Sequence, residues 1–169
     1  FGLNVTAGTG TLTFSDAVGA TTPLSGITVV SASQADFDST VATDGNIDID
    51  AGDVSFDQAV TTTSGGTVTI SNTGTLTIAA AADMNLDGAF SQDGTGETST
   101  AGDITTTADN ISFAEDVTLT GDVSHNTGAG GGDITYSSDV SGDFKLTATA
   151  DTGTINFLST VGVDLSLIH

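Results

Sequence analysis

The sequence predicts an all-β protein, and more specifically a parallel β-helix (a solenoid) of about 8 coils with roughly 21 residues in each coil. Three observations predict it. A short apolar phrase recurs at a nearly fixed spacing, apolar and polar residues alternate along the chain, and glycine-rich clusters separate the alternating segments. Together they are typical of short strands wound into stacked coils.

The recurring phrase has the form apolar-x-apolar, then three residues, then an apolar residue. It occurs at residues 12–18, 54–60, 111–117, 134–140 and 155–161. The last three copies start 23 and 21 residues apart, and the first two start 42 residues apart, which is twice 21. Such a period indicates one supersecondary unit per repeat, stacked on the next.

The strands follow from the alternation, which has a period of two residues. Thr, Ser, Asp and Asn stand between apolar residues at 46–50, 67–70, 75–78 and 118–120. This pattern predicts half-buried strands with one face directed inward, and Thr, Val, Ile and Phe suit such a surface. The recurring aromatic residues are expected in the core, and a stacked aromatic ladder is an alternative arrangement for them.

The predicted inward residues share an apolar side chain at alternating positions. They are Leu12, Phe14, Val18, Ile47, Ile49, Val54, Phe56, Val60, Val68, Ile70, Leu76, Ile78, Ile111, Phe113, Val117, Ile134, Tyr136, Val140, Phe144, Leu146, Ile155, Phe157 and Val161.

The corners follow from the turn clusters at 64–66, 72–74, 93–96 and 128–133, where glycine supplies the backbone freedom that tight turns require. The period falters over residues 79–102, so a loop inserted at one coil edge is expected there, and a second irregular loop is expected at 125–132. We interpret residues 1–169 as a single repeat array and expect it to be a piece of a much larger protein.

A β-sandwich, as in tandem adhesin modules, is the alternative architecture. It predicts strand spacings without a fixed coil length and usually a large buried aromatic residue. The chain contains no Trp, and the spacing near 21 residues favours the solenoid.

The charge balance narrows the choice of partners. There are 22 acidic residues against one basic residue, Lys145, and the formal net charge is −21. Such a surface repels nucleic acid and anionic membranes, and it attracts divalent cations and basic partners. No apolar run approaches the roughly 18 residues of a membrane-spanning helix, so direct membrane insertion is not expected.

Aspartates are the one chemically suggestive set. Asp44, Asp48, Asp50 and Asp53 concentrate carboxylates beside a turn and are candidate calcium ligands, because calcium prefers six to eight oxygen ligands. The segment matches neither an EF-hand loop nor the calcium-binding nonapeptide. Gly-Asp pairs recur at 52–53, 102–103, 121–122, 132–133 and 142–143, and we interpret them mainly as turns at the starts of strands, on a solvated acidic surface.

Residue types also bear on two other functions, ice binding and catalysis. Thr-x-Thr pairs at 11–13, 67–69, 75–77, 118–120 and 147–149 suggest an ice-binding plane, but their spacing is irregular. An enzyme is not expected, because the chain has no Arg, no Trp and one Tyr, and His125 has no nucleophile motif beside it. No catalytic residue is therefore predicted.

Residues 3–29 resemble the repeats of filamentous-haemagglutinin-like and autotransporter-like bacterial surface adhesins. The most specific part is Phe-x-x-Ala-Val-Gly-x-Thr-Thr-Pro-Leu at 14–24, and the looser phrase Gly-Asp-Ile-x-Tyr/Phe-x-x-x-Val covers much of the rest. The resemblance implies a secreted, right-handed β-helix that works in adhesion or as an extracellular fibre. It carries over no catalytic residues.

The sequence thus predicts an extracellular structural or adhesive module, a stiff acidic rod or fibre segment at the cell surface. Its expected partners are like coils or subunits stacked head to tail, and host or neighbouring-cell surface molecules. A calcium-binding or ice-binding solenoid is the alternative, and no cofactor other than calcium is suggested.

Overall fold

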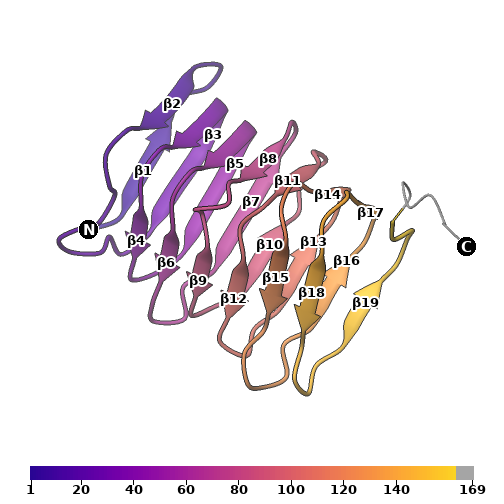
Figure 1. Cartoon of the computed structure of the whole chain (residues 1–169). Coiled ribbons are helices and arrows are strands. Elements are labelled where there is room, and N and C mark those ends of the chain that lie inside the picture. Colours follow the sequence, from indigo (N-terminus) through magenta and orange to yellow (C-terminus); the bar gives the residue numbers. More distant parts are fainter. Residues whose placement is uncertain (163–169) are drawn as a thin grey trace, which may run out of the picture.

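A computed structural model describes residues 1–162 of the chain. These residues form a β-solenoid of about seven turns, each of about 21 residues, and contain no helix (Figure 1). The predicted parallel β-helix is confirmed, and the number of coils is close to the 8 expected. All strand pairings between the described strands are parallel, which argues against the β-sandwich because sandwich sheets are antiparallel.

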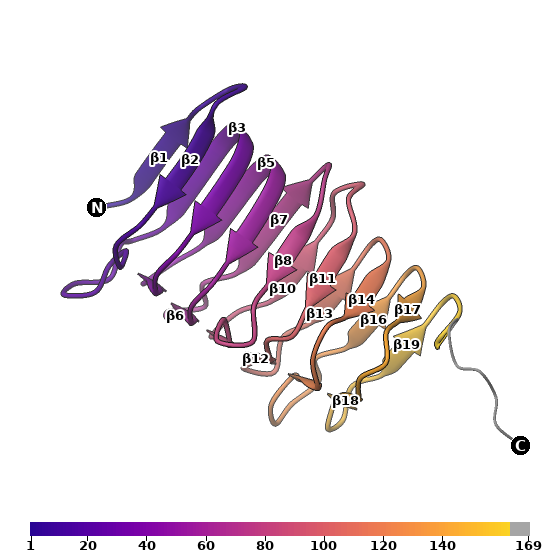
Figure 2. The same ribbon diagram turned by 45° about the horizontal axis from the view of Figure 1, so that its top comes forward.

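Three stacks of strands, here called the first, second and third faces, line the solenoid (Figure 2). In each stack a strand pairs with the strand one coil earlier and one coil later.

The first face consists of β1 (Leu3–Thr6), the first part of β3 (Ile27–Phe37), the first part of β5 (Ile47–Phe56), β7 (Val68–Asn72), β10 (Phe90–Gln92), β13 (Ile111–Phe113), β16 (Ile134–Tyr136) and β19 (Ile155–Phe157). The second face consists of β2 (Thr11–Phe14), the later parts of β3 and β5, β8 (Leu76–Ile78), β11 (Thr98–Thr100), β14 (Val117–Leu119) and β17 (Val140–Ser141). The third face consists of β4 (Val41–Thr43), β6 (Val60–Thr62), β9 (Met84–Leu86), β12 (Ile104–Thr106), β15 (Val123–Asn126) and β18 (Leu146–Thr149).

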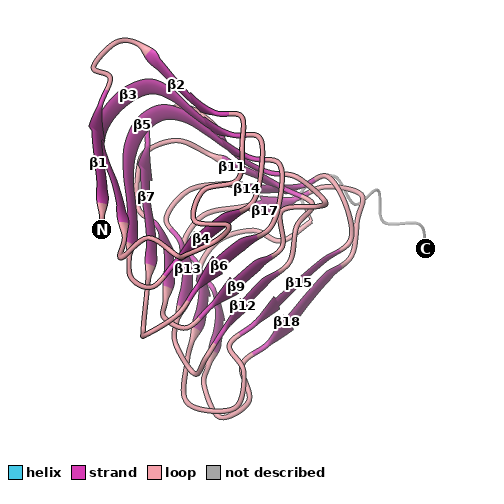
Figure 3. Cartoon of the chain, turned by 90° about the vertical axis from the view of Figure 1, so that its left-hand side faces the viewer, coloured by secondary structure: helices cyan, strands magenta, loops and turns pink. Residues whose placement is uncertain are grey.

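The corner between the first and second faces changes along the stack. In the early coils β3 and β5 each run over it as one bent strand, a path visible in Figure 3. From β7 and β8 onward the corner separates two short strands. The later corners contain glycines that the close approach of coils requires. A Cβ added at Gly96 would lie 1.7 Å from the Gly74 carbonyl oxygen of the previous coil.

The core is the column of inward residues. Most of the predicted inward residues are buried, including Ile47, Phe56, Ile111 and Val140. Phe144 is an exception: it is 49% exposed, at a corner between the second and third faces. The residues of the last described coil are open because no described coil covers them, and Phe157 and Val161 are 41% and 52% exposed.

The aromatic residues form two ladders. Phe14, Phe37 and Phe56 stack on the second face with centroids 4.8 Å apart. Phe90, Phe113, Tyr136 and Phe157 follow one another on the first face. The recurring phrase therefore occupies two places: residues 54–60 turn from the second face to the third, whereas residues 111–117 turn from the first to the second.

The loop predicted at residues 79–102 is wrong. This segment contains β9, β10 and β11, and each pairs with strands on both sides. The apolar pattern fades there because polar side chains take inward positions, namely Gln92, Thr98 and Thr100, all buried. The irregular segment expected at 125–132 starts two residues later, because His125 and Asn126 belong to β15.

Candidate functional site at the coil corners

The corner between the first and second faces is held from inside by two buried amides. Gln92 Nε2 donates hydrogen bonds to Asn72 Oδ1 and to the Gly96 carbonyl, both at 2.8 Å, and Gln92 Oε1 accepts one from the Ala114 amide at 3.1 Å. Asn72 Nδ2 in turn donates to the Gly74 carbonyl at 2.7 Å. Since buried polar groups are costly without partners, this network joins three successive coils while it satisfies their turns.

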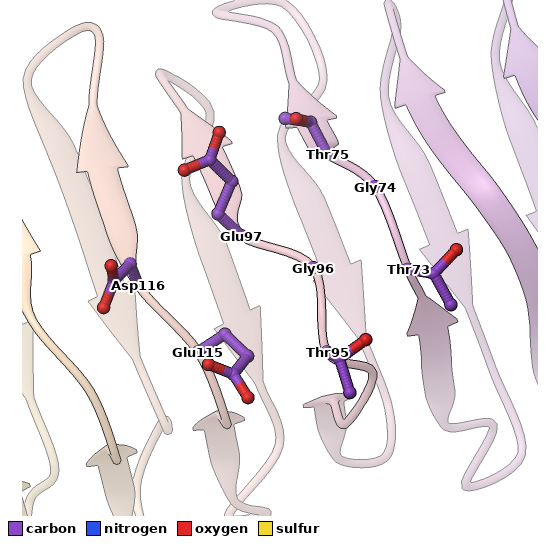
Figure 4. Close-up of a pocket in the computed structure, with 8 residues that line it drawn as sticks. All are labelled: Thr73, Gly74, Thr75, Thr95, Gly96, Glu97, Glu115 and Asp116. Atoms are coloured by element: carbon purple, nitrogen blue, oxygen red, sulfur yellow. The ribbon is translucent and has the colours of Figure 1, made fainter.

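Outside the same corner lies a polar groove of about 370 Å³ (Figure 4). Its walls are the turns at 73–75 and 95–97 together with Glu115 and Asp116. Glu97, Glu115 and Asp116 bring carboxylates from neighbouring coils to one surface, as Figure 4 shows. Asp116 already accepts hydrogen bonds from the Ser138 hydroxyl and from the Asp139 amide of the next coil.

Aspartate and asparagine side chains clamp one coil to the next at the corners. Four of the five Gly-Asp pairs do this: the carboxylates of Asp53, Asp103, Asp122 and Asp133 accept hydrogen bonds of 2.7–2.9 Å from backbone amides one coil later. Asn46 and Asn110 do the same at 3.1 and 2.8 Å. The acidic composition thus supplies acceptors for corner amides, which a bend in the chain would otherwise leave to solvent.

Two of the exposed carboxylates that accept hydrogen bonds from the next coil have a shifted pKa. Hydrogen bonds from Thr63 and Ser64 lower the pKa of the Asp44 carboxyl below its usual value. The Ser159 hydroxyl and the Thr160 amide lower the pKa of Asp139 in the same way. Both effects arise because these donors stabilise the ionised carboxylate.

The four calcium candidates do not converge on one point. Asp48 and Asp50 both lie on the outward face of β5, while Asp44 and Asp53 are occupied as acceptors for side-chain and backbone donors of the next coil. Asp48 and Asp50 share a groove with Asp93 and with Thr69 and Ser71. Within residues 1–162, no group of three or more His, Asp or Glu side chains is placed to hold a metal ion.

The outward surface carries one column of small polar side chains on each face. On the second face Ser55, Thr77, Ser99, Thr118 and Ser141 are stacked in register. Because most strands are three residues long and alternate in–out–in, each usually presents a single outward residue. In the pair Thr75–Thr77, Thr75 therefore falls at the corner, where the equivalent residues of other coils are Asp53, Glu97 and Asp116. The pairs at 11–13 and 147–149 lie within the longer strands β2 and β18.

Sequence reasoning missed the buried polar residues. Thr43 and Thr62 are the last residues of strands on the third face. The hydroxyl of each donates a hydrogen bond of 2.6 Å to a backbone carbonyl at the corner. The sequence does contain one indication of the two buried amides. Asn72 and Gln92 each stand two residues before a glycine, and they are 20 residues apart. His125 is also buried, and its Nδ1 lies 2.6 Å from the Tyr136 hydroxyl.

Comparison with known proteins returned no match among protein-family models, curated proteins or solved structures. In the described part of the chain, no helix has the length and apolar character needed to cross a membrane.

Proposed function

We propose that this chain is a structural or adhesive module of an extracellular protein, in which stacked β-coils form a stiff, acidic rod or fibre segment at the cell surface. The observation that carries the proposal is the unbroken stack of parallel strands on three faces, clamped from coil to coil by aspartate and asparagine. Such a stack resists bending because every coil is hydrogen-bonded to both neighbours.

The surface supports the same function. Outward columns of Ser, Thr and Asn keep the faces hydrated, and the net charge of −21 keeps neighbouring rods apart in dilute salt. Repulsion of this kind is screened within about 8 Å at physiological salt, so rods can approach one another or a partner surface there.

The location is testable on cells that express the native protein. Antibodies raised against this chain should label intact cells, and protease added outside should abolish the signal. An abundant cytosolic protein serves as the control for cell integrity. Labelling that appears only after the cells are lysed would rule out the surface function, whatever the shape of the rod.

The ends of the stack are proposed to take further coils of the same kind, arranged head to tail. At the last described coil, Phe157 stacks on Tyr136 with ring centroids 4.9 Å apart and is 41% exposed, and at the first coil Phe14 is partly exposed. Parallel pairing continued across such a junction is a heterologous contact, which extends into a filament rather than closing.

Sedimentation velocity at rising protein concentration tests this stacking. Association should weaken in a Phe157→Asp variant and remain in Thr147→Asp, which places the same charge on the side of the rod, at the exposed Thr147. Equal association of both variants would remove the end-to-end contact from the proposal.

Calcium binding is the second candidate function, and it rests on two carboxylates, Asp48 and Asp50, which share the outward face of β5. Millimolar calcium should then raise the melting temperature of the chain, and Asp48→Asn with Asp50→Asn should remove the increase. Magnesium at equal ionic strength is the control, since screening alone would act alike for both ions. An unchanged melting temperature with calcium would exclude specific binding.

A further inference from the structure

His125 stands out among the buried side chains because it is the one histidine in the described residues and has no access to solvent. It lies on β15 between Ile104 and Ala148 of the neighbouring coils. Its ring stacks beside Phe113, with centroids 5.2 Å apart, and beside Tyr136, at 5.9 Å. The Nδ1 atom contacts the Tyr136 hydroxyl at 2.6 Å, while the buried Nε2 atom has no hydrogen-bond partner.

No carboxylate compensates a positive charge at this position. The strands that pack against His125 are β12, β18, β13 and β16, and Tyr136 supplies their one titratable side chain. Asp103, Asp122 and Lys145 precede the third-face strands at the outer corner. There the carboxylates of Asp103 and Asp122 accept hydrogen bonds from the backbone amides of Ser124 and Lys145, and not from the imidazole.

A proton on His125 would also reverse its hydrogen bond. When the proton of neutral His125 is on Nε2, Nδ1 accepts the hydrogen bond of the Tyr136 hydroxyl, and burial raises the pKa of Tyr136, so that hydroxyl stays protonated. Once Nδ1 carries a proton it must donate to the Tyr136 oxygen instead, and the tyrosine hydrogen then loses its acceptor. In that tautomer the Nε2–H already lacks a partner, so protonation would leave a second buried donor unpaired, the tyrosine hydroxyl, beside a buried positive charge.

We propose that His125 and Tyr136 form an acid-sensitive latch in the core, whose protonation opens the C-terminal coils of the rod while the earlier coils stay folded. The opening is local because each coil contacts its neighbours alone, so loss of packing at β15 and β16 is not transmitted to β3 and β5. The latch depends on core geometry and holds wherever the chain is located.

The direction of the pH effect follows from burial. Burial lowers the pKa of His125 from 6.5 to about 4 in the folded chain. Between these values the unfolded coil binds more protons than the folded coil, so folding weakens as the pH falls. The ratio of closed to open coils should fall by up to roughly tenfold for each pH unit in this window, and no further once the pH is below about 4.

Tyr136 itself reports on the latch, because the chain has one Tyr and no Trp. Denaturant titrations followed by tyrosine fluorescence at pH 7, 6 and 5 should show wild type losing stability at each step. His125→Gln cannot titrate and should show little change over the same range, although its stability at pH 7 will differ. If His125→Gln loses stability with pH as wild type does, the latch is wrong.

Two further measurements keep the proposal testable if that variant does not fold. In wild type, the assigned NMR signal of His125 should not titrate near pH 6.5; a normal titration with unchanged tyrosine fluorescence would overturn the latch. Hydrogen exchange, corrected for the intrinsic effect of pH, should increase at pH 5 in β15–β19 and not in β3 and β5. Equal increases along the whole rod would contradict a local opening.

Discussion

Phe113 and Tyr136 stack face to face one coil apart, with ring centroids separated by 5.5 Å and ring planes tilted by 3°. Each ring covers the next along the rod axis, so the first-face ladder packs the coils together as well as filling their centre. The same ladder contacts the buried His125 through Phe113 and Tyr136, and it ends at Phe157 in the last described coil.

Removal of a central ring of this ladder should markedly lower the free energy of unfolding. Phe113→Ala empties a fully buried position and should destabilise the coils around β13 by about 3–5 kcal/mol. Phe157→Ala, at the open end, is the matched control and should cost less than half as much because that ring is already 41% exposed. Denaturant unfolding followed by Tyr136 fluorescence measures both, and equal losses would show that the ladder does not carry the packing.

The corner glycines make a sharper prediction. Gly96→Ala forces a Cβ to within 1.7 Å of the Gly74 carbonyl oxygen, so the coils must separate locally, at a cost of about 1–3 kcal/mol or more. Gly131→Ala is the control, since its added Cβ meets nothing within 4 Å. Thermal unfolding should distinguish the two variants, and a Gly96→Ala protein as stable as Gly131→Ala would mean that the corners are looser than described.

The buried amide network predicts a third effect. Gln92→Leu keeps the approximate volume of the side chain but removes the donor to Asn72 Oδ1 and to the Gly96 carbonyl, at about 1–3 kcal/mol for each acceptor that finds no other partner. The Ala114 amide keeps its hydrogen bond to the backbone carbonyl of residue 92. Thr95→Ala, at an exposed position of the same turn, should change stability little. A neutral Gln92→Leu would indicate that solvent replaces the amide.

Acid should act on the exposed clamps as well, in a lower pH range than on the histidine. The pKa of Asp139 is lower in the folded chain than its unfolded value of 3.8, so this carboxylate stabilises the fold above that pH. The stabilisation is lost as the pH falls through the folded pKa. Asp139→Asn should therefore weaken the dependence of stability on pH below about 4 and leave the dependence between pH 5 and 7 intact. Asp48→Asn, which removes an outward charge, is the comparison variant.

Much of the architecture could be predicted from apolar residues alone. The spacing and alternation around Ile111 and Val140 indicate short inward-facing strands at a fixed period, and both residues are buried as expected. The recurring apolar phrase does not indicate which corner of the coil it occupies, because any unit of strand, corner and strand produces the same pattern. That is why residues 54–60 and 111–117 look alike and yet lie on different faces.

Polar core residues limit such prediction. Gln92 and Thr100 interrupt the apolar pattern, so residues 79–102 resemble a loop although they form ordinary strands. Their burial is tolerated because corner carbonyls of the same coil, and for Gln92 also groups of the neighbouring coils, act as hydrogen-bond partners, which hydropathy does not record. The clamping role of Asp53 or Asp133 depends on the three-dimensional register between coils, whereas the Gly-Asp turn itself is visible in the sequence.

The neighbour-only contacts of the coils have a mechanical consequence. A pulling force applied to one end would not have to break the whole fold at once, because the terminal coil can peel from the next while the remainder stays intact. Each event would release about 21 residues, or roughly 70 Å of extended chain. The chain would then lengthen in equal steps under load and dissipate work at each one, as a tether that absorbs shocks does.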